Sequence, residues 1–191
     1  MLYGIIGKKG CGKTLMMTYL LKKYSEADKK IRIYTTYKLK GIKYEEINFM
    51  ELFKNDTEIK NAVVAIDEAY LFADCRTSSS KMNRIISYLL YQTRKTGVDM
   101  FFTAISFSTI EKRLRHNRDG LFFPNLYVDG KKILNPENIT QEKMNMLLAD
   151  NHIIQIKGLL VTDYGTKSFC IDHPEKIFSH YSSYEVIKPK I

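Results

Sequence analysis

Eight consecutive residues near the start of the chain have the types and spacing of a phosphate-binding loop. They run Gly7-Lys8-Lys9-Gly10-Cys11-Gly12-Lys13-Thr14 and fit the pattern G-x-x-x-x-G-K-[ST]. Glycines let such a loop turn tightly and direct backbone N–H groups at phosphate oxygens. We expect Lys13 to reach the β- and γ-phosphates of a nucleotide and the Thr14 hydroxyl to bind Mg²⁺. The candidate nucleotide-binding segment is therefore Gly7 to Leu15.

A second candidate site is an apolar run that ends in two acids. Val63-Val64-Ala65-Ile66 precedes Asp67-Glu68, which is a Walker B pattern. Asp67 is expected to hold Mg²⁺, and Glu68 to orient and deprotonate a water molecule. The second carboxylate favours nucleotide hydrolysis over transfer to a bound acceptor. A strand that merely ends in solvated acids is the alternative, and the phosphate-binding loop upstream favours the catalytic role.

A third group of polar residues lies downstream of the two acids. The strand candidate that follows Gly97 ends in Thr103-Ala104-Ile105-Ser106, and both Ser106 and Thr103 are candidates for a sensor of the γ-phosphate. Arg94 is a candidate arginine finger that completes the site of a neighbouring subunit, a contribution worth about 10³–10⁵ in rate in GTPases. An ordinary strand threonine and a surface arginine remain the alternatives.

Two basic segments are candidates for contacts with DNA or between subunits. Lys112–Arg118, which includes Arg113 and Arg115, would contact DNA phosphates, supply a second finger, or form a solvated helix face. Arg76 and Lys81 flank a serine-rich stretch that would either touch a nucleic-acid backbone or be an exposed loop, and Arg84 follows it. Composition does not decide between these alternatives.

The elements that must position these residues follow from local pattern. Apolar and β-branched runs predict strands, and longer periodic segments predict helices. The expected strands are 2–6, 31–37, 62–66, 98–105 and 120–123, the last stopped by Pro124, and the expected helices are 13–21, 48–54, 82–96 and 110–115. Alternation of the two types predicts an α/β fold with a mostly parallel central sheet flanked by helices.

The character of the sequence changes near Asp129. Turn residues occupy 129–132 and 135–138, residues 140–148 read as a helix, and two strand-like runs flank Asp163-Tyr164-Gly165 as in a hairpin. We expect a P-loop core at residues 1–128 and a small C-terminal extension, or appendage, at residues 129–191, packed on the core.

Composition bounds the class of protein. A chain of 191 residues suggests one domain with an extension. A formal net charge of +9 points to nucleic acid, or else to a lysine-rich solvated surface. Three dispersed cysteines suggest neither a zinc site nor a disulfide framework. No apolar run is long enough to cross a membrane, and the first strand leaves no room for a signal peptide. We expect a soluble protein in the cytoplasm, which is the host cytoplasm if the protein is viral.

The order of these motifs resembles the FtsK/HerA superfamily of P-loop translocases, and most of all the small genome-packaging ATPases and Zot-like proteins of viruses and mobile elements. The resemblance covers most of the chain but is poor over residues 129–171. It rests on residues 7–14, 65–70, 80–83, 92–99, 108–115 and 181–185.

The resemblance implies an ASCE or RecA-like P-loop fold and an ATPase that uses ATP and Mg²⁺ to move double-stranded DNA. It implies a ring of identical subunits, commonly a hexamer, in which Arg94 acts in trans, and a capsid or portal-like partner. Zot-like relatives carry a membrane segment, so its absence here favours a packaging motor without membrane insertion. The family's sensor glutamine is replaced by Ile105, so Ser106 or Ser108 would have to substitute.

Two other functions stay open at this point. A small-molecule P-loop kinase would need an acceptor pocket and a lid, and would leave Glu68 unexplained. A Zot-like or other nucleotide-gated assembly or secretion protein would use ATP to order an interface, with incidental turnover.

Overall fold

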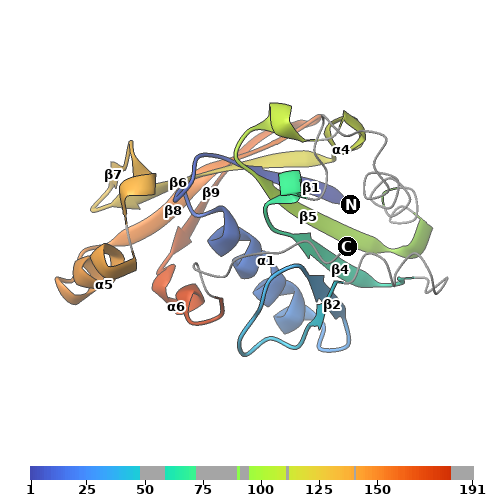
Figure 1. Ribbon diagram of the computed structural model, residues 1–191, viewed down its shortest axis with the longest axis horizontal. Coiled ribbons are helices and arrows are strands. Elements are labelled where there is room, and N and C mark those ends of the chain that lie inside the picture. Colours follow the sequence, from blue (N-terminus) through green and yellow to red (C-terminus); the bar gives the residue numbers. More distant parts are fainter. Residues whose placement is uncertain (48–58, 72–89, 91–94, 111, 140, 182–191) are drawn as a thin grey trace.

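The computed structural model describes residues 1–47, 59–71, 90, 95–110, 112–139 and 141–181, and shows an α/β fold (Figure 1). The strands are β1 Leu2–Ile6, β2 Arg32–Thr35, β3 Glu45–Glu46, β4 Ala62–Ile66, β5 Val98–Ala104, β6 Gly120–Val128, β7 Lys131–Lys132, β8 Ile154–Thr162 and β9 Gly165–Asp172. The α-helices are α1 Lys13–Ala27, α4 Lys112–His116, α5 Gln141–Ala149 and α6 Glu175–Phe178, with 3₁₀ turns η1 Ala69–Leu71, η3 Phe107–Thr109 and η4 Pro136–Asn138.

All nine of these strands join one sheet. Its order is β3-β2-β4-β5-β1-β6-β8-β9, and β7 pairs with β6. Pairing is parallel from β3 through to β6 and antiparallel among β6, β7, β8 and β9. The predicted mostly parallel sheet is confirmed. Strand β5 lies between β1, which leads into the glycine loop, and β4, which leads into the two acids.

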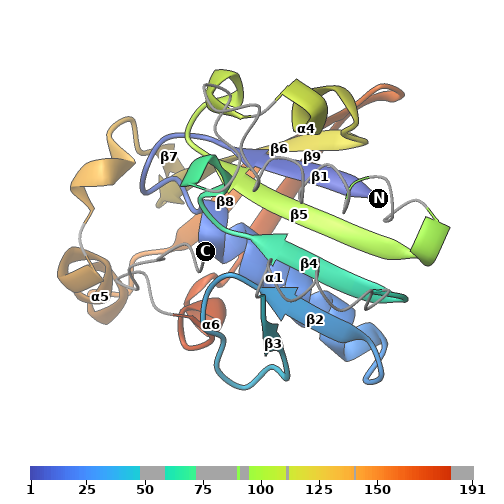
Figure 2. The same cartoon turned by 45° about the vertical axis from the view of Figure 1, so that its right-hand side comes forward.

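Helices cover both faces of the sheet, as the two hydrophobic clusters show. On one face, α1 and α6 pack against the alternate residues Ile5, Val63, Ala65 and Phe101. On the other face, Leu114 of α4 and Leu90 pack against Leu2, Val64, Met100 and Phe102. Because β4 is covered on both sides, all five of its residues are buried, as an uninterrupted apolar run predicts. Figure 2 shows α1 lying along the strands of the parallel part.

Strand β6 corrects the prediction that Pro124 ends it. The strand runs on to Val128, and its antiparallel pairing with β8 continues through the proline, which lies opposite Gly158. A Cβ atom on Gly158 would come within 2.1 Å of the Phe123 carbonyl oxygen. Pairing of β6 with β1 ends at Ile5↔Phe122, so at Pro124 the strand has a neighbour among the described strands only on the β8 side, and a proline is tolerated where one edge of a strand is unpaired.

The C-terminal part of the chain continues the same sheet. The predicted hairpin is confirmed, with β8 and β9 paired from Gln155↔Asp172 to Thr162↔Gly165. Between β6 and β8 the chain turns at Asp129, adds the short strand β7 beside β6, forms η4 and α5 outside the sheet, and returns at Ile153. We call residues 130–152 the excursion; β7 and α5 lie at one end of the molecule in Figure 1. The division at residue 128 stays a prediction.

Several predicted segments lie outside the described residues: the helix at 48–54, the serine-rich loop at 73–81 and most of the helix at 82–96. The predicted helix at 110–115 is observed as α4, and the one at 140–148 as α5. Within the described part of the chain, no helix is long and apolar enough to cross a membrane.

Candidate active site

The glycine-rich loop connects the carboxyl end of β1 to the first turn of α1. It is anchored by the Gly7 N–H, which donates to the Ala104 carbonyl on β5 at 3.1 Å, and by the Met16 N–H, which donates to the Gly12 carbonyl at 2.8 Å. Gly10 and Gly12 have φ angles of +78° and +94°, a region that favours glycine. The loop therefore has the tight, left-handed turns expected of a phosphate cradle.

Three side chains of the loop take distinct positions. Lys13 Nζ donates to the Lys8 carbonyl at 2.8 Å, so the ammonium group already lies against the loop to which phosphate would bind. The side chains of Cys11 and of Leu15, in the first turn of α1, are buried. Burial raises the pKa of the Cys11 thiol, and the neutral thiol serves as packing.

Asp67 lies immediately after β4 and accepts hydrogen bonds from two threonines. Thr14 Oγ1 donates to its Oδ2 at 3.0 Å, and Thr103 Oγ1 donates to its Oδ1 at 2.5 Å. The parallel register, Ile66↔Phe102, explains the second contact, because it puts Asp67 beside Thr103. Burial raises the pKa of Asp67, and the two hydroxyl donors act in the opposite direction. The strand order thus joins both sequence motifs at one edge of the sheet.

These residues fit a Mg²⁺ ion. The Thr14 hydroxyl directs its proton to Asp67, which leaves its oxygen lone pairs available to a cation. Mg²⁺ prefers oxygen ligands and is usually held by one or two protein groups together with phosphates and water. No group of three or more His, Cys, Asp or Glu side chains among the described residues could hold a metal alone.

Glu68 adopts a conformation that is uncommon for glutamate. Its φ angle is +50°, a left-handed value that costs on the order of 1–3 kcal/mol. Its N–H donates to Thr103 Oγ1 at 2.9 Å. Burial, followed by the charge and hydrogen bonding of Glu68, raises the pKa of Tyr70 to about 12, so a neutral phenol faces the glutamate. Glu68 is partly exposed, and its charge also helps to raise the pKa of Asp67.

The two sensor candidates differ in what they contact. Thr103 is fully buried, and its hydroxyl links both acids. The Ser106 hydroxyl instead lies 2.8 Å from the Ser108 hydroxyl and accepts from the Ser108 N–H at 3.3 Å, which caps η3. Ile105 between them is 50% exposed. The structure therefore brings Thr103 to the acids, and the sensor role of Ser106 stays a prediction.

Sequence reasoning missed Thr36. Its Oγ1 accepts a hydrogen bond from the Asp67 N–H at 2.9 Å, so three threonines surround that aspartate. The available signal was Thr35-Thr36 at the end of β2, because the carboxyl ends of parallel strands meet at one edge of a sheet. Tyr70 lies within residues 65–70, which carry the family resemblance, but no role was predicted for its side chain.

The basic candidates are only partly described. Arg94, Arg76, Lys81 and Arg84 lie outside the described residues. Arg113 of α4 is exposed, whereas the guanidinium groups of Arg115 in α4 and of Arg118 just beyond it lie 6.0 and 4.9 Å from the centre of the Phe107 ring. The buried Nε of Arg115 has no hydrogen-bond partner among the described residues. Arg115 and Arg118 therefore both pack on η3.

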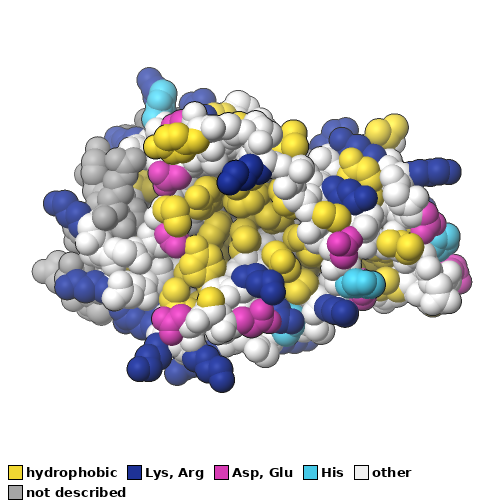
Figure 3. All heavy atoms as spheres, turned by 180° about the vertical axis from the view of Figure 1, so that it is seen from behind, with side chains coloured by type: hydrophobic (Ala, Val, Ile, Leu, Met, Phe, Trp, Pro, Cys, Tyr) yellow, Lys and Arg dark blue, Asp and Glu magenta, His cyan; other side chains and the backbone are white. Residues whose placement is uncertain are grey.

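The described residues form no continuous basic surface on the back face of the molecule. In Figure 3, hydrophobic side chains fill a hollowed central area, and lysine, arginine and acidic side chains are mixed around it.

A known protein-family model matches the first part of the chain. The model of the ATPase family associated with various cellular activities (AAA) matches residues 3–125. No curated protein sequence gives a significant match.

Solved structures share the fold at low sequence identity. B204, described as the DNA-packaging ATPase of Sulfolobus turreted icosahedral virus, has a TM-score of 0.54 at 14% identity and covers 87% of this chain and 95% of its own. ATPases 2 and 3 of EssC from Geobacillus thermodenitrificans have a TM-score of 0.54 at 13% identity, covering 91% of this chain and 39% of that one. The N-terminal domain of zonular occludens toxin from Neisseria meningitidis has a TM-score of 0.49 at 18% identity, covering 99% and 95%. The resemblance inferred from the motifs is confirmed at the level of the fold.

Proposed function

Because the chain belongs to the ATPase family associated with various cellular activities (AAA), we propose that it couples ATP hydrolysis to the movement of double-stranded DNA, as a viral genome-packaging motor. The observation that carries the hydrolytic part is the joining of Asp67 and Glu68 to the phosphate-binding loop. Thr14 and Thr103 each donate a hydrogen bond to Asp67, and Thr103 also accepts one from the Glu68 N–H.

Each residue of the site has a proposed part in hydrolysis. Lys13 and the loop N–H groups neutralise the triphosphate, and Thr14 and Asp67 would hold Mg²⁺, which when bound supplies further positive charge at the phosphates. Glu68 takes a proton from a water molecule while the oxygen of that water forms a bond to the γ-phosphorus. The bond from the γ-phosphorus to the bridging oxygen breaks, and ADP and phosphate leave. Arg94 of a neighbouring subunit completes the charge stabilisation.

The DNA part of the proposal has separate support. The net charge is +9, and Lys112 and Arg113 of α4 are exposed. A fold of the same type carries out DNA packaging in the virus protein B204. Phosphate contacts by lysine and arginine give a grip that is independent of sequence and weakened by salt. We expect a ring of identical subunits around the duplex and a capsid or portal-like partner.

The test is ATP hydrolysis by the wild type and by Glu68→Gln, with and without duplex DNA and over a series of salt concentrations. We expect Glu68→Gln to lose at least about a hundredfold in rate, which is the range for general-base catalysis, while still binding ATP. Glu26→Gln, on the exposed end of α1, is the matched control and should be unaffected. Normal hydrolysis by Glu68→Gln would exclude this base. A phosphorylated metabolite in place of free phosphate would identify a kinase.

A nucleotide-gated assembly or secretion protein is the second candidate. It is favoured by the exposed apolar side chains Leu134, Met146 and Ile153, which are 73%, 65% and 63% exposed in and beside the excursion. Surfaces of this kind often contact other proteins. ATP-dependent oligomerisation without DNA binding at low salt would favour this candidate over the motor.

A further inference from the structure

The glycine-rich loop is backed by the part of the chain that least resembles the translocase family. A Cβ atom built on Gly10 would lie 2.3 Å from the Pro136 carbonyl oxygen in η4. A Cβ atom on Gly12 would lie 2.6 Å from Ile156 Cδ1 on β8. Such distances are below any ordinary contact, so the loop backbone lies directly against both residues. Each of the two left-handed glycines therefore has one side packed directly against protein.

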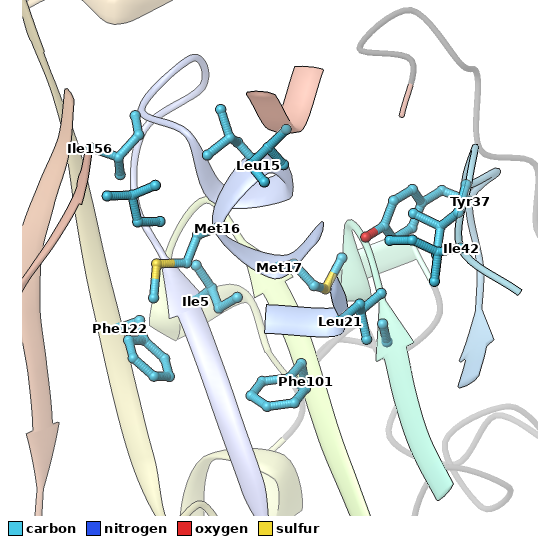
Figure 4. Packing of buried hydrophobic residues seen from close by; sticks show 14 of the residues in the cluster. Ile5, Leu15, Met16, Met17, Leu21, Tyr37, Ile42, Phe101, Phe122 and Ile156 are labelled. Carbon is cyan, nitrogen blue, oxygen red and sulfur yellow. The ribbon is translucent and has the colours of Figure 1, made fainter. Parts of the chain in front are cut away.

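Ile156 belongs to the same hydrophobic cluster as the start of α1. It is 1% exposed and shares that cluster with Leu15 and Met16. Figure 4 shows Ile156 reaching from β8 toward the loop and the first turn of α1. Its strand is fixed by a continuous antiparallel register with β6, from Gly120↔Thr162 to Val128↔Ile154. The residue that contacts Gly12 is thus held in place by the sheet.

We infer that Pro136 and Ile156 are positioning residues for nucleotide binding, and that residues 130–156 form the wall that holds the phosphate-binding loop in its binding conformation. A loop with three glycines has many accessible conformations, and ordering it on binding costs conformational entropy. A wall that already holds Gly10 and Gly12 removes part of that cost. The inference rests on the proposed nucleotide site and does not depend on DNA translocation.

The first experiment truncates the wall without changing the chain length. Ile156→Ala is compared with Ile33→Ala, because Ile33 is 2% exposed, lies in the same cluster and sits on β2. Binding of a fluorescent ATP analogue, the KM and kcat for ATP, and the melting temperature are measured. Both variants should have a lower melting temperature than the wild type, since both create a cavity.

Ile156→Ala and Ile33→Ala should differ in their affinity for nucleotide. We expect Ile156→Ala to bind about tenfold more weakly, with KM raised more than kcat is lowered, and Ile156→Val to recover most of the affinity. Ile33→Ala should stay within about twofold of the wild type. A tenfold change corresponds to about 1.4 kcal/mol. Equal affinities for the two alanine variants would overturn the inference, because Ile156 would then act only through stability.

The second experiment removes the excursion. Residues 130–152 are replaced by Asn-Gly, which closes a hairpin of type I′. The geometry allows this because the Asp129 N–H donates to the Ile153 carbonyl at 2.8 Å, so the strand ends are already adjacent. Circular dichroism should show that the sheet is retained, and nucleotide binding should weaken by about tenfold or more. Wild-type affinity in this variant would contradict the wall role of Pro136.

Two further variants distinguish this inference from the proposed function. Lys13→Ala should lose nucleotide binding with or without the wall, and Glu68→Gln should keep binding but lose hydrolysis. If duplex DNA does not stimulate ATP hydrolysis by the wild type although ATP binds normally, that result would count against the motor and leave the inference about the wall unaffected. Normal ATP binding in Ile156→Ala and in the shortened chain would count against the wall and leave the ATPase in place.

Discussion

The parallel and antiparallel parts of the sheet contribute to the candidate site in different ways. In the parallel part, Thr14 follows the loop after β1, and Asp67, Glu68 and Thr103 lie at the carboxyl ends of β4 and β5. In the antiparallel part, β8 presents the Ile156 side chain to the loop, and η4, between β6 and β8 in the chain, presents the Pro136 carbonyl oxygen. The parallel part therefore supplies the polar groups of the site, whereas the antiparallel part supplies the surface against which the loop packs.

Substitution of Asp67 should have the largest effect on activity. Asp67→Asn should lower Mg²⁺-dependent hydrolysis by at least about a hundredfold, because it removes the carboxylate expected to hold the ion. The melting temperature of the nucleotide-free protein should not fall. Burial raises the pKa of this carboxyl group in the folded chain, so its charged form costs stability at neutral pH, and this cost disappears as the pH falls through that pKa.

The measurement is a pair of melting curves and a steady-state assay. Wild type and Asp67→Asn are compared at neutral pH and at a pH below the ordinary carboxyl range, where their stabilities should converge. A variant that hydrolyses ATP normally would remove Asp67 from the site.

Thr103 tests the connection between β5 and the acids. Thr103→Val removes the donor to Asp67 and the acceptor for the Glu68 N–H while keeping the shape, and each such bond is worth about 0.5–1.5 kcal/mol. We expect hydrolysis to fall by roughly tenfold to a hundredfold, on the conversion of 1.4 kcal/mol per tenfold. Thr103→Ser retains both bonds and is the matched control. Equal rates for the two variants would show that the hydroxyl is dispensable.

Gly158 tests the antiparallel part alone. A side chain there would meet the Phe123 carbonyl oxygen at 2.1 Å and the Phe169 ring at 2.8 Å, so Gly158→Ala should destabilise the fold by about 1–3 kcal/mol. The kcat at saturating ATP should change little, because no group at the acids is altered. Thermal denaturation and a saturation curve check both statements. A large fall in kcat with unchanged stability would contradict the separation of shape from chemistry.

Arg118 is expected to give the smallest effect. Its guanidinium group lies over Phe107, and an exposed cation–π contact is worth about 0.5–1 kcal/mol. Arg118→Ala should lower stability by that amount and leave DNA affinity nearly unchanged, whereas Arg113→Ala should reduce DNA affinity and its dependence on salt. Chemical denaturation and a salt series of binding curves test the pair. Equal losses of DNA affinity would favour a DNA-contacting face that includes both arginines.

Sequence prediction succeeded where local pattern and local chemistry agree. The run that forms β4 is apolar throughout because both of its faces are covered, and Gly10 and Gly12 are required by positive φ angles. Prediction failed at Pro124, because the rule that proline ends a strand takes no account of which edge of the strand is paired. Only the sheet shows that β1 stops pairing with β6 at Phe122, whereas β8 continues past the proline.

The site was predicted in part for the same reason. Lys13, Thr14, Asp67 and Glu68 were found because a motif encodes their roles in a few adjacent residues. Thr36 was not found, and Thr103 was considered only as a sensor, since their contacts with the acids follow from strand order. Arg94 and the basic loop stay predictions, since they lie outside the described residues.

The sequence alone determined the phosphate-binding loop, the paired acids and the α/β class, because each depends on interactions within a few residues or on the period of a single element. Only the tertiary structure decided that β5 lies between the two motif strands, that Thr103 links Asp67 to Glu68, and that Pro136 and Ile156 back the loop. Those contacts join residues far apart in the chain, and their geometry is set by the pairing of strands and by the packing of one shared core.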